Sequence, residues 1–147
     1  MKLSNLEARW AEAALGAIFP GSKDAGMAGI RGMDVRGFLS EVLGAVPFQA
    51  ALGLRIAIWL VALAPLFIIG RFKTISGLTQ PDRERVVAAL VGHRSYALRS
   101  LTLILKTMGA LLWAGDDAVR AHMLAPAPAP APKNELIPLR VKRAAVA

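Results

Sequence analysis

The stretch that decides the fold is FQAALGLRIAIWLVALAPLFIIG, residues 48–70. Its part 56–70 carries no charged side chain and is flanked by arginines. A membrane-spanning helix needs about 20 apolar residues, and Pro65 removes a backbone hydrogen bond and bends a helix. Two interpretations stay open. The segment is either the buried central helix of a bundle, or a helix that dips into a bilayer interface and makes membrane contacts through Trp59, Leu63, Phe67 and Arg71.

Two shorter helices are predicted before this segment. Ser4 and Glu7 have the spacing of a capping box, which predicts that a helix begins directly after the serine. A Phe-Pro-Gly sequence at 19–21 ends this helix. Glycines recur through residues 21–37, which predicts a loop, and a short helix follows over residues 34–43.

Two further helices are predicted after it. Residues 79–82 supply an N-cap, an early proline and an acidic first turn, so one helix begins there. A longer helix runs from near Ser95 to Ala114, with residues 117–123 adding one more turn. Five apolar side chains recur along the longer helix at spacings of three and four, namely Leu98, Leu101, Leu105, Met108 and Leu112.

The composition agrees with a helical protein. The 147 residues are 55% hydrophobic and 6% aromatic, and they include no cysteine. Strand-like alternation of apolar and polar residues is nearly absent. We therefore expect an all-α fold, a compact bundle of about five helices in one domain over residues 1–124. The absence of cysteine excludes disulfides, thiolate nucleophiles and cysteine-bound metals.

An Ala-Pro repeat at 125–132 separates this domain from the end of the chain. Alternating prolines prohibit a helix, so residues 125–147 are expected outside the bundle as an extended Ala-Pro C-terminal tail. Two interpretations of this tail stay open, a disordered terminus and an arm that docks on a partner or on anionic headgroups. The second depends on apolar and basic side chains, Leu136, Ile137, Leu139, Arg140, Lys142 and Arg143.

The chain is strongly basic, with 18 Lys and Arg against 10 Asp and Glu and a formal net charge of +8. All of the excess lies in residues 55–147. Such an imbalance suits an anionic partner, which here means a membrane surface or an acidic protein. Nucleic acid is not expected, because the cations are spread singly among apolar residues and no nucleic-acid-binding motif accompanies them.

Motifs for catalysis and metal binding are missing from the sequence. There is no Glu-x-x-His pair, nucleophile elbow, phosphate-binding loop or His-Glu-x-x-His motif. The two histidines, His93 and His122, are too few for a histidine-rich metal site. We therefore predict no catalytic, cofactor-binding or metal-ligating residue in this chain.

The polar stretch that begins at His93 suits partner binding better than catalysis, because no carboxylate lies nearby in sequence to orient the imidazole. Arg99 and Lys106 lie on nearly one helical face and could meet carboxylates of a partner. Trp113, near the end of that face, has the amphipathic character of an interface anchor. The predicted partner-interface residues are Arg94, Tyr96, Arg99, Lys106 and Trp113.

The second half of the chain also carries the pattern Phe72-x-x-Ile75-x-x-Leu78-x-x-x-Asp82-Arg83-x-Arg85-x-x-x-x-Leu90, then Ser95-x-x-x-Arg99, Leu105-Lys106 and Trp113-x-x-Asp116. This pattern resembles the small helical subunit of membrane-associated flavoprotein dehydrogenases, the gluconate 2-dehydrogenase subunit 3 type. It is also similar to the helical segment preceding the flavin domain of long-chain alcohol oxidases in the glucose–methanol–choline (GMC) family. With the N-terminal helix included, the likeness covers residues 3–123.

The resemblance implies a non-catalytic accessory subunit that binds and stabilises a GMC-type FAD-dependent dehydrogenase or oxidase and seats it at a membrane. FAD, the catalytic base and the substrate pocket would belong to the flavoprotein large subunit, with no cofactor in this chain. Small subunits of this type commonly begin with a twin-arginine leader, and no export signal is visible here. We therefore expect a location in the cytoplasm or at the cytoplasmic face of the membrane.

The competing class of function is a helical membrane-embedded subunit of a larger energy-transducing or pigment-binding complex. Residues 48–70 and 98–115 would then face lipid or pigment. Lys106, in the middle of the second segment, counts against a plain membrane span.

Overall fold

A computed structural model describes residues 3–21 and 28–125, so the predicted tail beyond residue 125 lies outside the described part of the chain. The described residues form six α-helices and one 3-10 turn and contain no strand, which confirms the all-α prediction. In chain order these elements are α1 (Asn5–Ile18), α2 (Val35–Ala45), α3 (Phe48–Ile68), η1 (Ile75–Gly77), α4 (Gln80–Val91), α5 (Tyr96–Gly115) and α6 (Asp117–Leu124).

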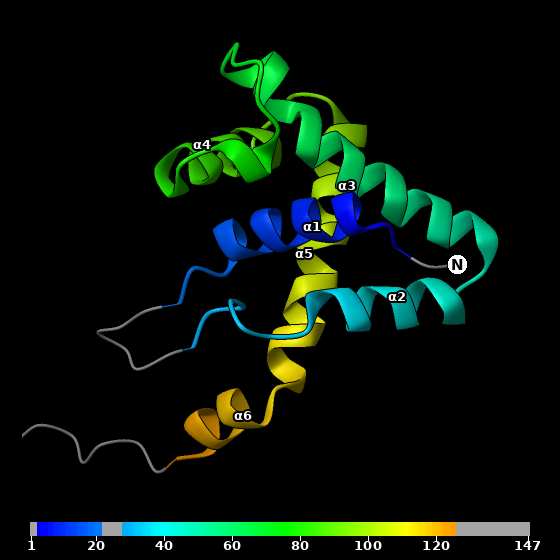
Figure 1. Cartoon of the computed structure of the whole chain (residues 1–147), viewed down its shortest axis with the longest axis vertical. Helices are drawn as coiled ribbons and strands as arrows, with labels where there is room; N and C mark the ends of the chain where they lie inside the picture. The colour runs from blue at the N-terminus through cyan, green and yellow to red at the C-terminus, as the bar shows by residue number, and fades with distance from the viewer. Residues whose placement is uncertain (1–2, 22–27, 126–147) are drawn as a thin grey trace, which may run out of the picture.

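Helix α1 lies at the centre of the bundle and packs against α2, α3, η1, α4 and α5 (Figure 1). The predicted capping box is confirmed, since the Glu7 N–H donates to Ser4 Oγ at 3.2 Å and the Ser4 N–H donates to Glu7 Oε2 at 2.9 Å. Small side chains allow the neighbouring helices to approach α1 closely. Its buried alanines are Ala8, Ala11, Ala13, Ala14 and Ala17.

Helix α3 is buried on one side only. Its inner side packs on α1, α4 and α5 with aliphatic side chains, which include Leu54, Ile58 and Val61. Its outer side exposes large apolar residues, Phe48, Leu52, Ile56, Trp59 and Phe67. The segment therefore packs on the core along one side and carries, on the other, an apolar surface that the described core does not cover, so both interpretations stay open.

Helix α5 crosses α1 at a glycine. The predicted apolar stripe of α5 faces the bundle, with Leu105 fully buried and the other four side chains half-buried. Gly109 is buried at the crossing point. A Cβ atom there would lie 2.6 Å from Leu15 Cδ2 and 2.7 Å from Phe19 Cε2, so any larger residue at this position would force these two side chains to shift.

One helix start differs from the sequence prediction. The Thr79 hydroxyl donates to Asp82 Oδ2 at 3.0 Å instead of accepting a backbone N–H, so this threonine does not cap α4 with its side chain. Helix α6 agrees with the turn predicted over residues 117–123 and ends one residue later. Asp116 caps it, because Asp116 Oδ1 accepts the N–H groups of Ala118 and Val119 at 3.0 and 3.2 Å.

Candidate functional site

A hydrophobic groove of about 730 Å³ runs along the outer side of α3. Glu7, in the first turn of α1, lines one part of this groove, and His93, in the connection between α4 and α5, lines another. The walls are aliphatic and aromatic, and they include three of the predicted membrane contacts, Trp59, Leu63 and Phe67. The structure thus places these three side chains on one continuous apolar surface.

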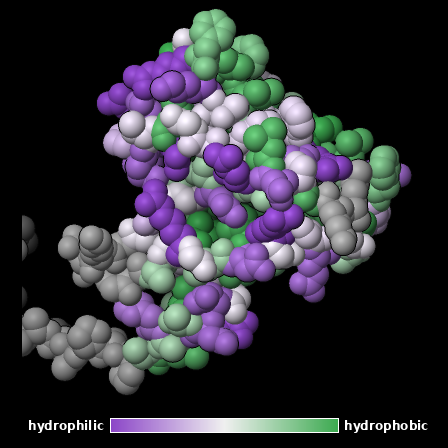
Figure 2. Space-filling model, viewed as in Figure 1, coloured by the Kyte–Doolittle hydropathy of each residue, from purple (hydrophilic) through white to green (hydrophobic). Residues whose placement is uncertain are grey.

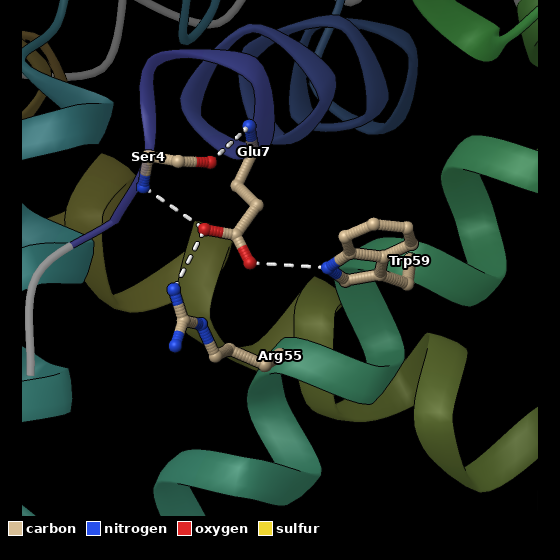
Figure 3. A network of polar contacts seen from close by, with 4 residues as sticks. All are labelled: Ser4, Glu7, Arg55 and Trp59. Carbon is tan, nitrogen blue, oxygen red and sulfur yellow. Dashed lines mark hydrogen bonds and ion pairs between the residues drawn. The ribbon is translucent and has the colours of Figure 1, made fainter.

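A cluster of polar contacts borders the groove and joins α1 to α3 (Figure 3). Glu7 is 4% exposed, and its carboxylate accepts hydrogen bonds from two side chains of α3. Arg55 Nη2 donates to Oε2 at 2.9 Å, and the indole Nε1 of Trp59 donates to Oε1 at 3.0 Å. Trp59 also packs edge-on against Trp10, with ring centroids 5.1 Å apart. Trp59 is therefore a structural residue as well as a groove residue.

The same contacts set the ionisation of Glu7. Burial by itself would raise the pKa of this carboxyl group, because it penalises the charged form. The hydrogen bonds from Arg55, Ser4 and Trp59 outweigh burial and lower the pKa of Glu7 from 4.5 to about 2. Glu7 is therefore ionised throughout the physiological range, and its role is to hold two helices together rather than to exchange protons.

The predicted partner-interface residues divide into two groups in the structure. Arg94, Tyr96 and Lys106 are exposed. Arg99 is half-buried, and its Nη1 donates to the carbonyl oxygen of His93 at 3.1 Å. The imidazole Nδ1 of His93 in turn accepts the backbone N–H of Ser95 at 3.0 Å. The polar stretch around His93 therefore fixes the connection between α4 and α5.

Trp113, like Arg99, is a predicted interface residue whose side chain makes contacts within the chain. Its ring stacks on Phe19 with centroids 6.3 Å apart, and its Nε1 donates to the carbonyl oxygen of Ala28 at 2.8 Å. These contacts join the C-terminal half of α5 to the end of α1 and to the segment before α2. Trp113 is half-buried, so part of the indole still reaches the surface.

Sequence reasoning missed a second apolar surface, on the outer side of α5. Leu103 and Leu111 are 48% and 56% exposed, and Ile104 between them is also exposed. Residues seven apart share a helical face, which places Tyr96 with Leu103 and Ile104 with Leu111. The signal was present in the sequence, because α5 has apolar residues on both sides of its inward stripe and few charged ones.

In the described part of the chain, no group of three or more His, Asp or Glu side chains could hold a metal ion. Two helices are long and apolar enough to cross a membrane, judged by length and composition. They are α3, whose most apolar window is 44% buried in the bundle, and α5, whose window is 17% buried.

Comparison with known proteins identified no relative. No protein-family model matches the chain, and no similar curated protein or solved structure was found.

Proposed function

We propose that this chain is a non-catalytic accessory subunit that binds and stabilises a larger flavoprotein of the GMC type through the outer side of α5. The observation that carries this proposal is the exposure of Leu103, Ile104 and Leu111 on a helix whose other side already packs in the core. Exposed large apolar side chains gathered on one side of a helix in a small folded domain are typical of a protein–protein contact. The class of partner comes from the resemblance of the sequence to GMC-associated small subunits.

The arrangement of side chains on α5 fits a docking surface. Fully buried interface centres are apolar and often hold aromatic side chains, and polar and charged residues gather toward their rims. Leu103, Ile104 and Leu111 supply an apolar centre, with Tyr96 at 77% exposure toward the N-terminal end and Lys106 on the adjacent side. Because Arg99 and Trp113 are engaged within the chain, we assign them a smaller share of the interface than the sequence did.

The double variant Leu103→Ser and Leu111→Ser tests this assignment. Loss of two apolar contacts at the centre should weaken binding to the flavoprotein by about 2 to 4 kcal/mol. The matched control is Leu6→Ser with Leu124→Ser, since these leucines are also exposed but lie on α1 and α6. The measurement is the amount of flavin that co-purifies with a tagged chain from its native cells. Equal flavin recovery with both double variants would remove α5 from the interface.

A second candidate is a membrane-embedded subunit of a larger complex, and the shallow burial of α5 favours it. Extraction of native membranes with alkaline carbonate separates the two candidates. An accessory subunit that touches the membrane from outside should be released, whereas a membrane-spanning subunit should remain in the pellet. Retention in the pellet without any associated flavin would favour the second candidate.

A further inference from the structure

One end of the molecule carries exposed aromatic side chains next to cations. Phe67 at the end of α3 is 85% exposed, and Phe72 in the following connection is 96% exposed. Arg71 and Lys73 flank Phe72 and are also exposed. Figure 1 shows the connection between α3 and α4 projecting at the top of the view, at the opposite end from α6, and in Figure 2 hydrophobic side chains protrude there.

The connection between α4 and α5 contributes to the same end. Phe67 and Ile68 line the groove together with His93 and Leu98, so the end of α3 and the connection between α4 and α5 border the same groove. Next to His93, Arg94 and Tyr96 are exposed. We call this set the aromatic–basic tip, and its members are Phe67, Arg71, Phe72, Lys73 and Arg94.

Cations outnumber carboxylates around the tip and the groove. The sequence contains no Asp or Glu between Glu41 and Asp82, or between Glu84 and Asp116. These two intervals supply the outer side of α3, the tip and the whole of α5. Of the nearby carboxylates, Glu7 bonds to Arg55 and Asp82 pairs with Arg71. Neither interval therefore supplies a carboxylate that would repel a negatively charged surface at the tip.

We propose that the aromatic–basic tip inserts into the headgroup region of an anionic lipid bilayer and that the groove behind it faces the acyl chains. Aromatic side chains at the boundary between water and lipid bury their rings while staying near polar groups, and nearby Lys and Arg bind acidic headgroups. The tip has both components, and Phe67 belongs to the tip and the groove at once.

Membrane insertion explains the exposure of Phe67 and Phe72 better than a protein contact does. Neither ring contributes to the core. Phe67 lies in the last turn of α3, and Phe72 lies on the projecting connection that follows, with a cation on each side in sequence. A tip of this shape can enter a fluid headgroup region without a complementary pocket. The inference rests on the proposed function only for the identity of the bound protein. If α5 binds a flavoprotein, the tip would hold that flavoprotein at the membrane.

Flotation with lipid vesicles tests the insertion. The full chain is synthesised in a cell-free system with vesicles present, either of phosphatidylcholine alone or of phosphatidylcholine mixed with phosphatidylglycerol. The chain should float with the mixed vesicles, and added salt should weaken this binding. Flotation that is equal with both vesicles and insensitive to salt would overturn the role of the cations. Absence of flotation with either would overturn the whole inference.

Variants locate the contact on the molecule. Phe67→Ser with Phe72→Ser should reduce the floating fraction about tenfold or more, because both inserted rings are lost. Lys73→Gln with Arg94→Gln should reduce it about tenfold or more on the mixed vesicles only. The matched controls are Met123→Ser with Leu124→Ser, which are exposed apolar residues of α6, and Arg9→Gln with Arg36→Gln, which are exposed cations elsewhere. Equal losses in tip and control variants would contradict insertion through the tip.

A site-specific label separates lipid from protein as the covering material. The sequence has no cysteine, so Phe72→Cys and Met123→Cys each give one attachment point for a polarity-sensitive fluorophore. The label at position 72 should move to an apolar environment when mixed vesicles are added, and the label at 123 should not. A label at 72 that is already apolar in the lipid-free complex with the flavoprotein would overturn the inference, because protein would then cover the tip.

These readouts keep the two proposals apart. Vesicle binding is measured with the chain alone and needs no flavoprotein. A chain that floats but never co-purifies with flavin would support the membrane contact and contradict the proposed function. A chain that co-purifies with flavin but does not float would support the proposed function and contradict the membrane contact.

Discussion

At the scale of single residues, Glu7 should control how stability depends on pH. Its folded-state pKa of about 2 lies below the unfolded value of 4.5, so ionised Glu7 stabilises the fold above about pH 4.5. That stabilisation is about 3 kcal/mol, since each pKa unit corresponds to about 1.4 kcal/mol. It should disappear as the pH falls from about 4.5 to about 2.

The variant Glu7→Gln removes this charge and nearly preserves the side-chain shape. Urea unfolding followed by circular dichroism, in a mild detergent, should show a loss of about 3 kcal/mol at pH 7 that shrinks on acidification toward about pH 2. Glu12→Gln on the exposed side of α1 is the control and should change stability by less than about 0.5 kcal/mol. A Glu7→Gln loss that stayed constant with pH would show that the ion pair is not its source.

Arg99 and Lys106 should behave differently, although the sequence treats them as a pair. Arg99→Ala removes the hydrogen bond to the His93 carbonyl and should destabilise the isolated chain by about 1 to 2 kcal/mol. Lys106→Ala removes an exposed cation and should leave the isolated chain within about 0.5 kcal/mol. Urea unfolding measures both, and equal losses would contradict the distinction.

At the scale of helices, two glycines should respond to alanine in opposite directions. Gly109→Ala places a methyl group against Leu15 and Phe19 where α5 crosses α1, and overpacking should cost about 1 to 3 kcal/mol. Gly53→Ala in α3 meets nothing within 4 Å and should gain about 0.5 to 1 kcal/mol from helix propensity. Thermal unfolding compares them. A stabilising Gly109→Ala would show that the two helices are farther apart than described.

The local sequence predicted well where the helices lie along the chain, but it did not predict which residues of other helices contact them. The capping box at Ser4 and Glu7 and the inward stripe of α5 are confirmed because both depend on residues within a few positions of one another. The bonds from Arg55 and Trp59 to Glu7 could not be predicted, since they join residues 48 and 52 positions apart. The sequence suggested apolar surfaces on α3 and α5 but could not decide whether they are covered, because periodicity shows which residues share a face but not whether a neighbour packs on it.

At the scale of the whole molecule, the chain should depend on its partner for solubility. Apolar side chains remain exposed on α3, on α5 and at the tip. Surfaces of this kind favour aggregation when nothing covers them. Expression of the chain alone should therefore give mostly insoluble protein, and co-expression with the flavoprotein should raise the soluble fraction, as measured by centrifugation and immunoblotting. A monodisperse monomer obtained without partner or detergent would contradict this expectation.

The most direct measurement is purification of the tagged chain from its native cells in mild detergent, followed by size-exclusion chromatography with simultaneous light scattering and visible absorbance. We expect one peak in which flavin absorbance coincides with this chain and a GMC-type flavoprotein in a fixed ratio. The same peak from the Leu103→Ser and Leu111→Ser variant should contain the flavoprotein at a strongly reduced level. Elution of the wild-type chain without flavin, alone or with other membrane proteins, would contradict its proposed function as a flavoprotein subunit.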